Sequence, residues 1–385
     1  GQDVRKTLRD LPEASVHTVC TSPPYWGLRD YGTGDAQIGL EQTPDEYVHQ
    51  LVEVFREVAR VLRPDGTLWL NLGDSYVGGG RAGSNPEYHA KHTMFGKTVD
   101  PTEHGKFGLP QPIPEGLKAK DMAGMPWRVA FALQADGWYL RSAAPWIKKS
   151  AMPESVTDRP SSALEYIFLL AHPKSGGKYF YDIDAVRAGS AQPNRVRKDT
   201  FGGASWEGRQ QHSLGGEFLG SSLRNRRNTD WFFESVSEVA SGVQSVVVAA
   251  DGTPLAFVVN PKSYKGAHFA VWPPSLVEPM ILAGTSAEGC CANCGAPWRR
   301  GGERPCQCDT EERVRAVVLD PFSGSATTGM VALQNGRDYI GCDLNAEYLG
   351  MAEARIRDRP PPKAEKVEQG VSIMSLFGNS EAEDT

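Results

Sequence analysis

The stretch Val317-Val318-Leu319-Asp320-Pro321-Phe322-Ser323-Gly324-Ser325-Ala326-Thr327-Thr328-Gly329 determines the fold that we expect for this chain. Its first four residues are typical of a buried parallel strand, and an apolar helix follows the glycine-containing turn. A second strand, residues 339–342, ends at Asp343, 23 positions after Asp320. A strand, a small-residue turn and a helix, with an acid roughly 20 residues further on, form an arrangement that binds ribose hydroxyls.

The turn lacks two common phosphate-binding motifs. It contains no G-x-G-x-x-G, which argues against a dinucleotide, and no G-K-[ST], which excludes a Walker A loop. A nucleoside cofactor without phosphates fits better. We therefore expect S-adenosylmethionine.

A second informative segment, Thr21-Ser22-Pro23-Pro24-Tyr25, follows a strand-like run at residues 16–20. The two prolines fix the backbone angles and carry no N–H, and a residue before proline adopts an extended conformation. The result is a rigid set of oxygen acceptors beside an aromatic ring, which suits a planar base with an exocyclic amine. On the pattern alone, an ordinary proline-rich turn at the end of a strand is an open alternative.

Together the two segments resemble the DNA amino-methyltransferases of the permuted β class. In that family an S/D-P-P-Y motif precedes a D-P-F-x-G-x-G motif, as it does here, and Ala326 stands in place of the second glycine. Residues 68–74 and 268–276 add to the resemblance, which spans about residues 3–357. It implies an α/β fold, a doubly wound and mostly parallel sheet of the S-adenosylmethionine-dependent methyltransferase type, circularly permuted.

The resemblance also implies the roles of individual residues. Ser22 Oγ and the Pro23 carbonyl would accept the N–H groups of a base amine, with Pro24 completing the loop. Tyr25 would stack on a base flipped out of the DNA duplex. We expect the cofactor site to comprise Asp320, Phe322, Ser323, Gly324, Ser325, Thr327, Thr328, Asp343, Asn345, His268, Trp272 and Pro274.

The methylated base follows from one residue only. In this family, serine in the first motif position usually accompanies cytosine N4 and aspartate accompanies adenine N6, so Ser22 favours N4-methylcytosine. Adenine N6 is the alternative within the class. Two other classes stay open: a non-catalytic, zinc-containing nucleic-acid-binding protein, and a methyltransferase acting on RNA or a free nucleobase.

The chain divides into four parts by composition and pattern. Capping residues Thr43 and Glu46 predict a helix up to residue 62, the Pro64-Asp65-Gly66 turn ends it, and a strand follows at 68–72. The predicted parts are a catalytic half at 1–189 with a mobile insert at 78–120, a target-recognition region at 190–262 with a hairpin within 243–259, a cofactor half at 263–357 with a zinc-knuckle insert at 289–309, and a disordered tail at 358–385.

Charge is distributed unevenly. The net charge of −6 argues superficially against DNA, but residues 187–228 hold eight basic and three acidic side chains, a local balance of +5. Local positive potential governs contact with phosphates, although a solvated arginine-rich loop has the same composition. The candidate DNA contacts are Arg195, Arg197, Lys198, Arg224, Arg226 and Arg227.

Five of the seven cysteines lie between residues 290 and 308. Cys291 and Cys294 form a C-x-x-C and Cys306 and Cys308 a C-x-C, and in an intracellular chain such pairs favour structural zinc over disulfides. Cys290 could replace Cys291 as a ligand, and redox chemistry or reduced thiols are the alternatives. The insert is far in sequence from the S-P-P-Y loop, so we do not expect a catalytic metal.

Composition fits an intracellular enzyme. The 385 residues, 40% hydrophobic and 23% charged, suffice for a large core in one domain with inserts or in two domains. No stretch approaches the roughly 20 apolar residues that span a membrane, and no secretory signal is visible. We expect a cytoplasmic protein encoded by a bacterium, archaeon or phage. Its partners would be double-stranded DNA, a cognate restriction endonuclease and a second copy in a homodimer.

Overall fold

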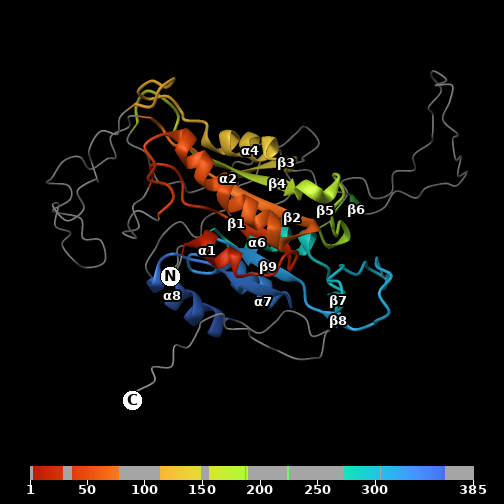
Figure 1. Cartoon of the computed structure of the whole chain (residues 1–385). Helices are drawn as coiled ribbons and strands as arrows, with labels where there is room; N and C mark the ends of the chain where they lie inside the picture. Colours follow the sequence, from red (N-terminus) through yellow and green to blue (C-terminus); the bar gives the residue numbers. More distant parts are fainter. Residues whose placement is uncertain are drawn as a thin grey trace, which may run out of the picture.

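The computed structural model describes most of both expected halves of the catalytic domain (Figure 1). The described residues are 3–28, 37–77, 113–148, 156–186, 188–189, 223–224, 272–303 and 305–359. Most of the insert at 78–120, most of the recognition region with its expected hairpin, and most of the tail therefore lie outside the described residues.

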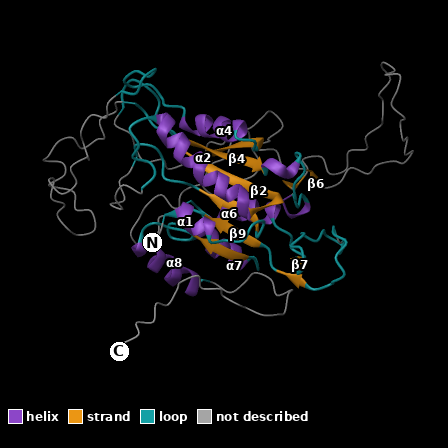
Figure 2. Cartoon of the chain, viewed as in Figure 1, coloured by secondary structure: helices purple, strands orange, loops and turns teal. Residues whose placement is uncertain are grey.

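A six-stranded sheet forms the centre of the described structure (Figure 2), with strand order β10-β9-β1-β2-β4-β3. The bounds, in that order, are Asp338–Gly341, Val317–Asp320, Val16–Thr21, Leu62–Leu72, Leu164–Ala171 and Tyr139–Ile147. β10, β9, β1 and β2 pair in parallel, whereas β4 is antiparallel to both of its neighbours. β4 is thus the one reversed strand of this sheet, which is mostly parallel, as expected.

Helices cover both faces of the sheet. Successive strand residues such as Val19 and Cys20 point to opposite faces and belong to separate apolar clusters. The cluster of Val19 contains residues of α1, α2 and α4, and the cluster of Cys20 contains residues of α6 and α7, so the two groups of helices pack on opposite faces (Figure 1). The sheet is therefore doubly wound. The helix bounds are Val4–Arg9 for α1, Pro44–Val61 for α2, Met125–Ala135 for α4, Pro274–Gly284 for α6, Thr327–Gln334 for α7 and Ala346–Arg357 for α8.

Short elements complete the described structure. They are the 3-10 helices η2 (Pro173–Ser175) and η3 (Asp184–Val186), and two ribbons in which β5 (Ala188–Gly189) pairs with β6 (Leu223–Arg224) and β7 (Cys290–Cys291) with β8 (Arg313–Val314). No helix in the described ranges is long and apolar enough to cross a bilayer.

The beginning of α2 confirms the predicted capping box. Thr43 Oγ1 accepts a hydrogen bond from the Glu46 N–H at 3.2 Å, and Glu46 Oε2 accepts one from the Thr43 N–H at 3.0 Å. The helix buries Leu51, Phe55 and Val58 against the sheet. The prediction that the helix extends to residue 62 and ends in a turn at Pro64-Asp65-Gly66 is wrong. The helix ends at Val61, and β2 starts at Leu62, which already has extended backbone angles, so Pro64-Asp65-Gly66 belongs to the strand.

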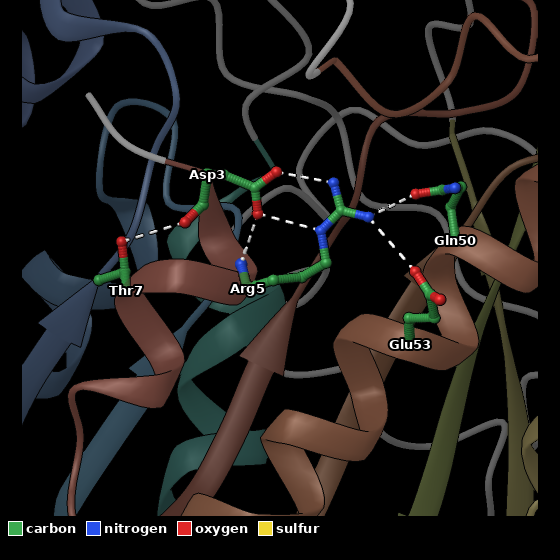
Figure 3. A network of polar contacts seen from close by, with 5 residues as sticks. All are labelled: Asp3, Arg5, Thr7, Gln50 and Glu53. Atoms are coloured by element: carbon green, nitrogen blue, oxygen red, sulfur yellow. Dashed lines mark hydrogen bonds and ion pairs between the residues drawn. The ribbon is translucent and has the colours of Figure 1, made fainter.

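A polar network joins α1 to α2 on the surface (Figure 3). Asp3 caps α1 by accepting the Arg5 N–H at 2.8 Å, and its carboxylate holds the Arg5 guanidinium at 2.7 Å. Arg5 also donates to Gln50 at 2.6 Å and to Glu53 at 3.3 Å. The hydrogen bond from Arg5 holds the pKa of Asp3 below its ordinary value. The network fixes α1 beside α2.

Candidate active site

The carboxyl ends of β1 and β9 meet at the centre of the sheet. The two strands are neighbours, with Val19 opposite Leu319. α2, which follows β1 along the chain, and α7, which follows β9, pack on opposite faces. Such a switch point leaves a crevice at the carboxyl ends of parallel strands, where ligands of α/β proteins bind. The S-P-P-Y loop and the turn of residues 321–328 both begin at this edge.

A hydrogen bond joins the two segments directly. Thr21 Oγ1, at the end of β1, donates to Asp320 Oδ1 at 2.7 Å. Asp320 also accepts from the Phe322 N–H at 3.1 Å and from Thr328 Oγ1 at 2.7 Å, and only 2% of Asp320 is exposed. Burial raises its pKa to about 6 against the opposing effect of these hydrogen bonds. Asp320 thus holds together the turn of residues 321–328 and the end of β1.

The S-P-P-Y loop is anchored by a hydrogen-bond network centred on Asn71. Asn71 Nδ2 donates to Tyr25 Oη at 2.8 Å, to Glu165 Oε2 at 2.9 Å and to Ser22 Oγ at 3.3 Å. Tyr25 Oη donates to Glu165 Oε2 at 2.8 Å. Burial, together with the Glu165 charge, raises the pKa of Tyr25 well above its ordinary value, so the phenol stays protonated.

Glu165 is in turn paired with a cation. Lys148 Nζ forms an ion pair with Glu165 Oε1 and lies 4.8 Å from the centre of the Trp146 ring. Only 8% of the Glu165 side chain is exposed, and a buried carboxylate needs such a partner. The sequence gives no signal for Asn71, Glu165 or Lys148, because Asn71 and Glu165 lie on β2 and β4 amid apolar strand residues and Lys148 directly follows β3.

The two proline carbonyls have different surroundings. Tyr47 Oη donates to the Pro24 carbonyl at 2.8 Å, which fixes that part of the loop to α2. Among the described residues, no donor reaches the Pro23 carbonyl. Gly73 leaves room for the loop, because a Cβ at that position would come within 2.6 Å of the Tyr25 ring.

The second half of the site centres on Asp343, just after β10. Its Oδ2 accepts from the Gly324 N–H and its Oδ1 from the Asn345 N–H, both at 2.8 Å. Burial raises the pKa of this carboxyl group. A Cβ added at Gly324 would meet no heavy atom within 4 Å, so the chain leaves open space beside this turn. Asn345 caps α8 by accepting the Glu347 N–H at 2.9 Å.

Other residues expected at the cofactor site hold the turn in shape. Ser323 Oγ and Tyr339 Oη share a hydrogen bond of 2.7 Å. Arg355, which the sequence did not suggest, donates to Ser325 Oγ and Thr327 Oγ1 at 2.9 Å each. Ala326 has φ +56°, a left-handed conformation that glycine adopts more readily.

The remaining predicted positions are only partly described. Trp272 is 7% exposed and packs in the apolar cluster of α6 and α7, and Pro274 is the first residue of α6. Phe322 packs partly buried against the other cluster. His268, Arg195, Arg197, Lys198, Arg226 and Arg227 lie outside the described residues, and of Arg224 only the backbone pairing with Ala188 is described.

The four predicted zinc ligands come together. The Sγ atoms of Cys291, Cys294, Cys306 and Cys308 all lie within 4.8 Å of one another, while Cys290 is not in this group. The cluster adjoins the amino-terminal ends of the strands, since Gly295 and Val317 both contact His17 near the start of β1. It lies at the edge of the sheet opposite to Ser22 and Asp320.

Comparison with known proteins shows the family of this chain. The family model for DNA methylases of the N6/N4 methyltransferase type matches residues 16–354. The chain belongs to this DNA methylase family. The chain is 38% identical over 355 residues to the Type II methyltransferase M.Cfr9I of Citrobacter freundii. The aligned residues cover 92% of this chain and 86% of that relative. The chain is 36% identical over 357 residues to the Type II methyltransferase M.SmaI of Serratia marcescens, covering 93% and 89%.

A DNA methylase must bring a base and a methyl donor together. In this chain the S-P-P-Y loop and the turn of residues 321–328 begin at one edge of the sheet, and the bond between Thr21 and Asp320, 299 residues apart, joins the strands that lead into them.

Proposed function

We propose that this DNA methylase transfers a methyl group from S-adenosylmethionine to the exocyclic N4 of a cytosine flipped out of double-stranded DNA. The observation that carries the proposal is the position of Ser22 Oγ and the Pro23 carbonyl. Both lie in a loop anchored by Asn71 and Glu165, at the end of the strand that Thr21 joins to Asp320.

An exocyclic base amine is a poor nucleophile, because its lone pair is delocalised into the ring. In the proposed mechanism Ser22 Oγ and the Pro23 carbonyl accept its N–H groups and favour a tetrahedral nitrogen with an available lone pair. Positioned acceptors act mainly through orientation and electrostatics. The Pro23 carbonyl suits this role because no described residue donates to it, whereas the Pro24 carbonyl is engaged by Tyr47.

Tyr25 would stack on the flipped base. Its hydroxyl is fixed by Glu165 and Asn71, so its ring is held in one orientation before DNA arrives. Flipping costs a few kcal/mol, and a preorganised ring offsets part of this cost. In this proposal Lys148 acts through Glu165 by neutralising the carboxylate that holds Tyr25.

The open space beside Gly324 and the acceptor oxygens of Asp343 fit a nucleoside cofactor. Asp343 would accept hydrogen bonds from ribose hydroxyls through its remaining lone pairs. Asp320 would contribute by fixing the turn of residues 321–328, and Phe322, Trp272 and Pro274 by bounding the site. When bound, S-adenosylmethionine supplies the electrophilic methyl group.

Several finer parts of the proposal rest on the family resemblance. Ser22 favours cytosine N4, and adenine N6 is the alternative. The S-P-P-Y segment precedes the cofactor strand, which is the permuted order. The relatives are named as Type II methyltransferases, so we propose that this chain also protects cytoplasmic DNA against a cognate endonuclease. The arginine-rich region would contact phosphates, and the chain would act as a homodimer.

Nucleoside analysis of methylated DNA tests the proposal. Duplex DNA is incubated with the full chain and labelled S-adenosylmethionine, digested to nucleosides and analysed by mass spectrometry. N4-methylcytosine is expected. N6-methyladenine would instead support adenine N6 as the methylated position. If RNA in a parallel reaction is labelled and duplex DNA is not, DNA is not the substrate. If the chain does not bind S-adenosylmethionine in calorimetry, it is not a methyltransferase that uses this donor.

A further inference from the structure

We propose that Cys291, Cys294, Cys306 and Cys308 bind one zinc ion, and that this zinc site braces the amino-terminal edge of the central sheet through His17 and Arg63. This site does not depend on which base is methylated, and it lies at the edge of the sheet opposite to the proposed active site.

The backbone around the first two cysteines forms a closed turn. Cys291 ends β7, the Cys291 carbonyl accepts the Gly295 N–H at 2.8 Å, and the Cys291 N–H donates to the Ala296 carbonyl at 2.9 Å. Gly295 has φ +69°, a conformation in which other residues are strained. The turn therefore presents Cys291 and Cys294 to the same point.

The second pair is brought back by the ribbon of β7 and β8. Cys291 lies opposite Arg313, and the Ala292 N–H donates to the Glu312 carbonyl at 3.0 Å. This pairing returns the segment that carries Cys306 and Cys308 to the turn. The four Sγ atoms, all within 4.8 Å of one another, form a compact group of thiols.

The chemistry of this group matches zinc. Zn–S bonds of about 2.3 Å in a tetrahedron place sulfur atoms about 3.8 Å apart, so the cluster needs little contraction. Binding replaces four S–H protons, which pass to solvent, by four Zn–S bonds and leaves a net charge of −2 at the site. The guanidinium of Arg63, which is paired with Asp65, donates to the Cys294 carbonyl beside this site.

Two side chains connect the cysteine turn to the sheet. His17, on β1, makes a 3.0 Å hydrogen bond through Nε2 to the Gly295 carbonyl, and its Nδ1 accepts the Val317 N–H of β9 at 3.0 Å. A neutral ring protonated at Nε2 satisfies both contacts. Arg63, on β2, reaches the Cys294 carbonyl and is held by Asp65 at 2.9 Å. The turn thereby contacts β1 and β2 directly and is linked to β9 through His17.

Metal analysis of the full chain tests the binding site. Protein purified under reducing conditions without chelators is expected to contain about one zinc per chain, as a four-cysteine site requires. Cys306→Ser and Cys308→Ser should each lose most of it. Cys290→Ser is the matched control, because Cys290 adjoins Cys291 yet lies outside the cluster, and it should keep its zinc.

Three results would overturn the site: metal-free wild-type protein from zinc-supplemented cells, full zinc content in both serine variants, or loss of zinc from the Cys290→Ser control. If the serine variants do not fold, the wild-type protein is used to test which groups hold the zinc. A mercurial reagent that titrates its thiols must then release the zinc in parallel, and thiols that react without zinc release would contradict the proposal.

Thermal unfolding tests the brace. Stripping zinc from the wild type is expected to lower its Tm by about 5 °C or more, since a bound ligand stabilises the folded state. In His17→Ala the same treatment should lower Tm by less than half as much, because the contact with the sheet is already lost. Equal shifts in Tm in both proteins would show that His17 does not connect the zinc site to the sheet. An unchanged Tm of the wild type would show that zinc does not stabilise this edge of the sheet.

Discussion

Thr21 Oγ1 donates a 2.7 Å hydrogen bond to Asp320 Oδ1, and this contact links the strand that leads into the S-P-P-Y loop with the strand that leads into the turn of residues 321–328. Both residues are buried. Their contact fixes the relative position of the two halves of the proposed active site, so changes in either half should have separable effects on catalysis and on cofactor binding.

Replacing Ser22 by alanine should lower turnover far more than cofactor affinity. A hydrogen bond that strengthens as charge develops is worth about 1.5–3 kcal/mol, or about 10- to 160-fold in rate. Initial methylation rates and calorimetric affinity for S-adenosylmethionine measure the two effects. Ser15→Ala, which removes an exposed hydroxyl bonded to the Pro12 carbonyl, is the control. Equal loss of rate and affinity would contradict the role of Ser22.

The ring of Tyr25 should matter more for DNA binding than its hydroxyl. Stacking of a base on an aromatic ring is worth about 1–3 kcal/mol, so Tyr25→Ala should weaken binding of a duplex with a mismatched target base by about tenfold or more. Tyr25→Phe keeps the ring and loses only the hydrogen bonds of the hydroxyl with Glu165 and Asn71, so it should bind much more tightly than Tyr25→Ala. Fluorescence anisotropy compares them, and similar losses in both variants would argue against stacking.

Asp343→Asn should weaken binding of S-adenosylmethionine about tenfold, because a hydrogen bond to a charged acceptor is worth about 1.5–3 kcal/mol. The amide oxygen can still accept one of the two backbone N–H groups, so the turn should stay folded. Asp338→Asn, at the other end of β10, is the control and should keep full affinity. Calorimetry decides, and unchanged affinity in the Asp343 variant would exclude this residue from the site.

The carboxyl group of Asp320 should make stability depend on pH. Burial raises its pKa from 3.8 to about 6, so the folded state holds the proton more tightly than the unfolded chain does. Its contribution is therefore most favourable below about pH 4 and is lost as pH rises through about 6. A shift of this size corresponds to about 3 kcal/mol.

Urea unfolding of the cofactor-free protein at pH 5 and pH 7.5 measures this effect. The wild type should lose more unfolding free energy between these pH values than Asp320→Asn, in which the group cannot ionise. Comparing the two proteins cancels contributions from other carboxyl groups, such as Asp343. An identical pH dependence in both proteins would show that Asp320 does not carry the effect.

Local sequence signals predicted much of the fold. Thr43 and Glu46 predicted the start of α2, and the apolar run after residue 316 predicted β9, because capping and periodicity depend on residues close together in the chain. The cysteine spacing likewise predicted a cluster whose four members the structure brings together.

The supporting network of the active site carried no such signal. Glu165 contacts Lys148, Asn71 and Tyr25, which are 17, 94 and 140 positions away in the chain. Nothing in the strand sequence around Glu165 indicates which of its faces is buried or what it meets there. Tertiary pairing of β2, β3 and β4 determines these contacts, and only the structure supplies it.

The pairing of β1 with β9 also has a consequence for synthesis of the chain. Thr21 emerges from the ribosome 299 residues before Asp320, which at 5–20 residues per second is an interval of about 15 to 60 s. Throughout that interval β1 has an unpaired edge, and such edges invite association with other chains. The edge of β1 that pairs with β9 is therefore uncovered until the last fifth of the chain, which carries β9, has been synthesised.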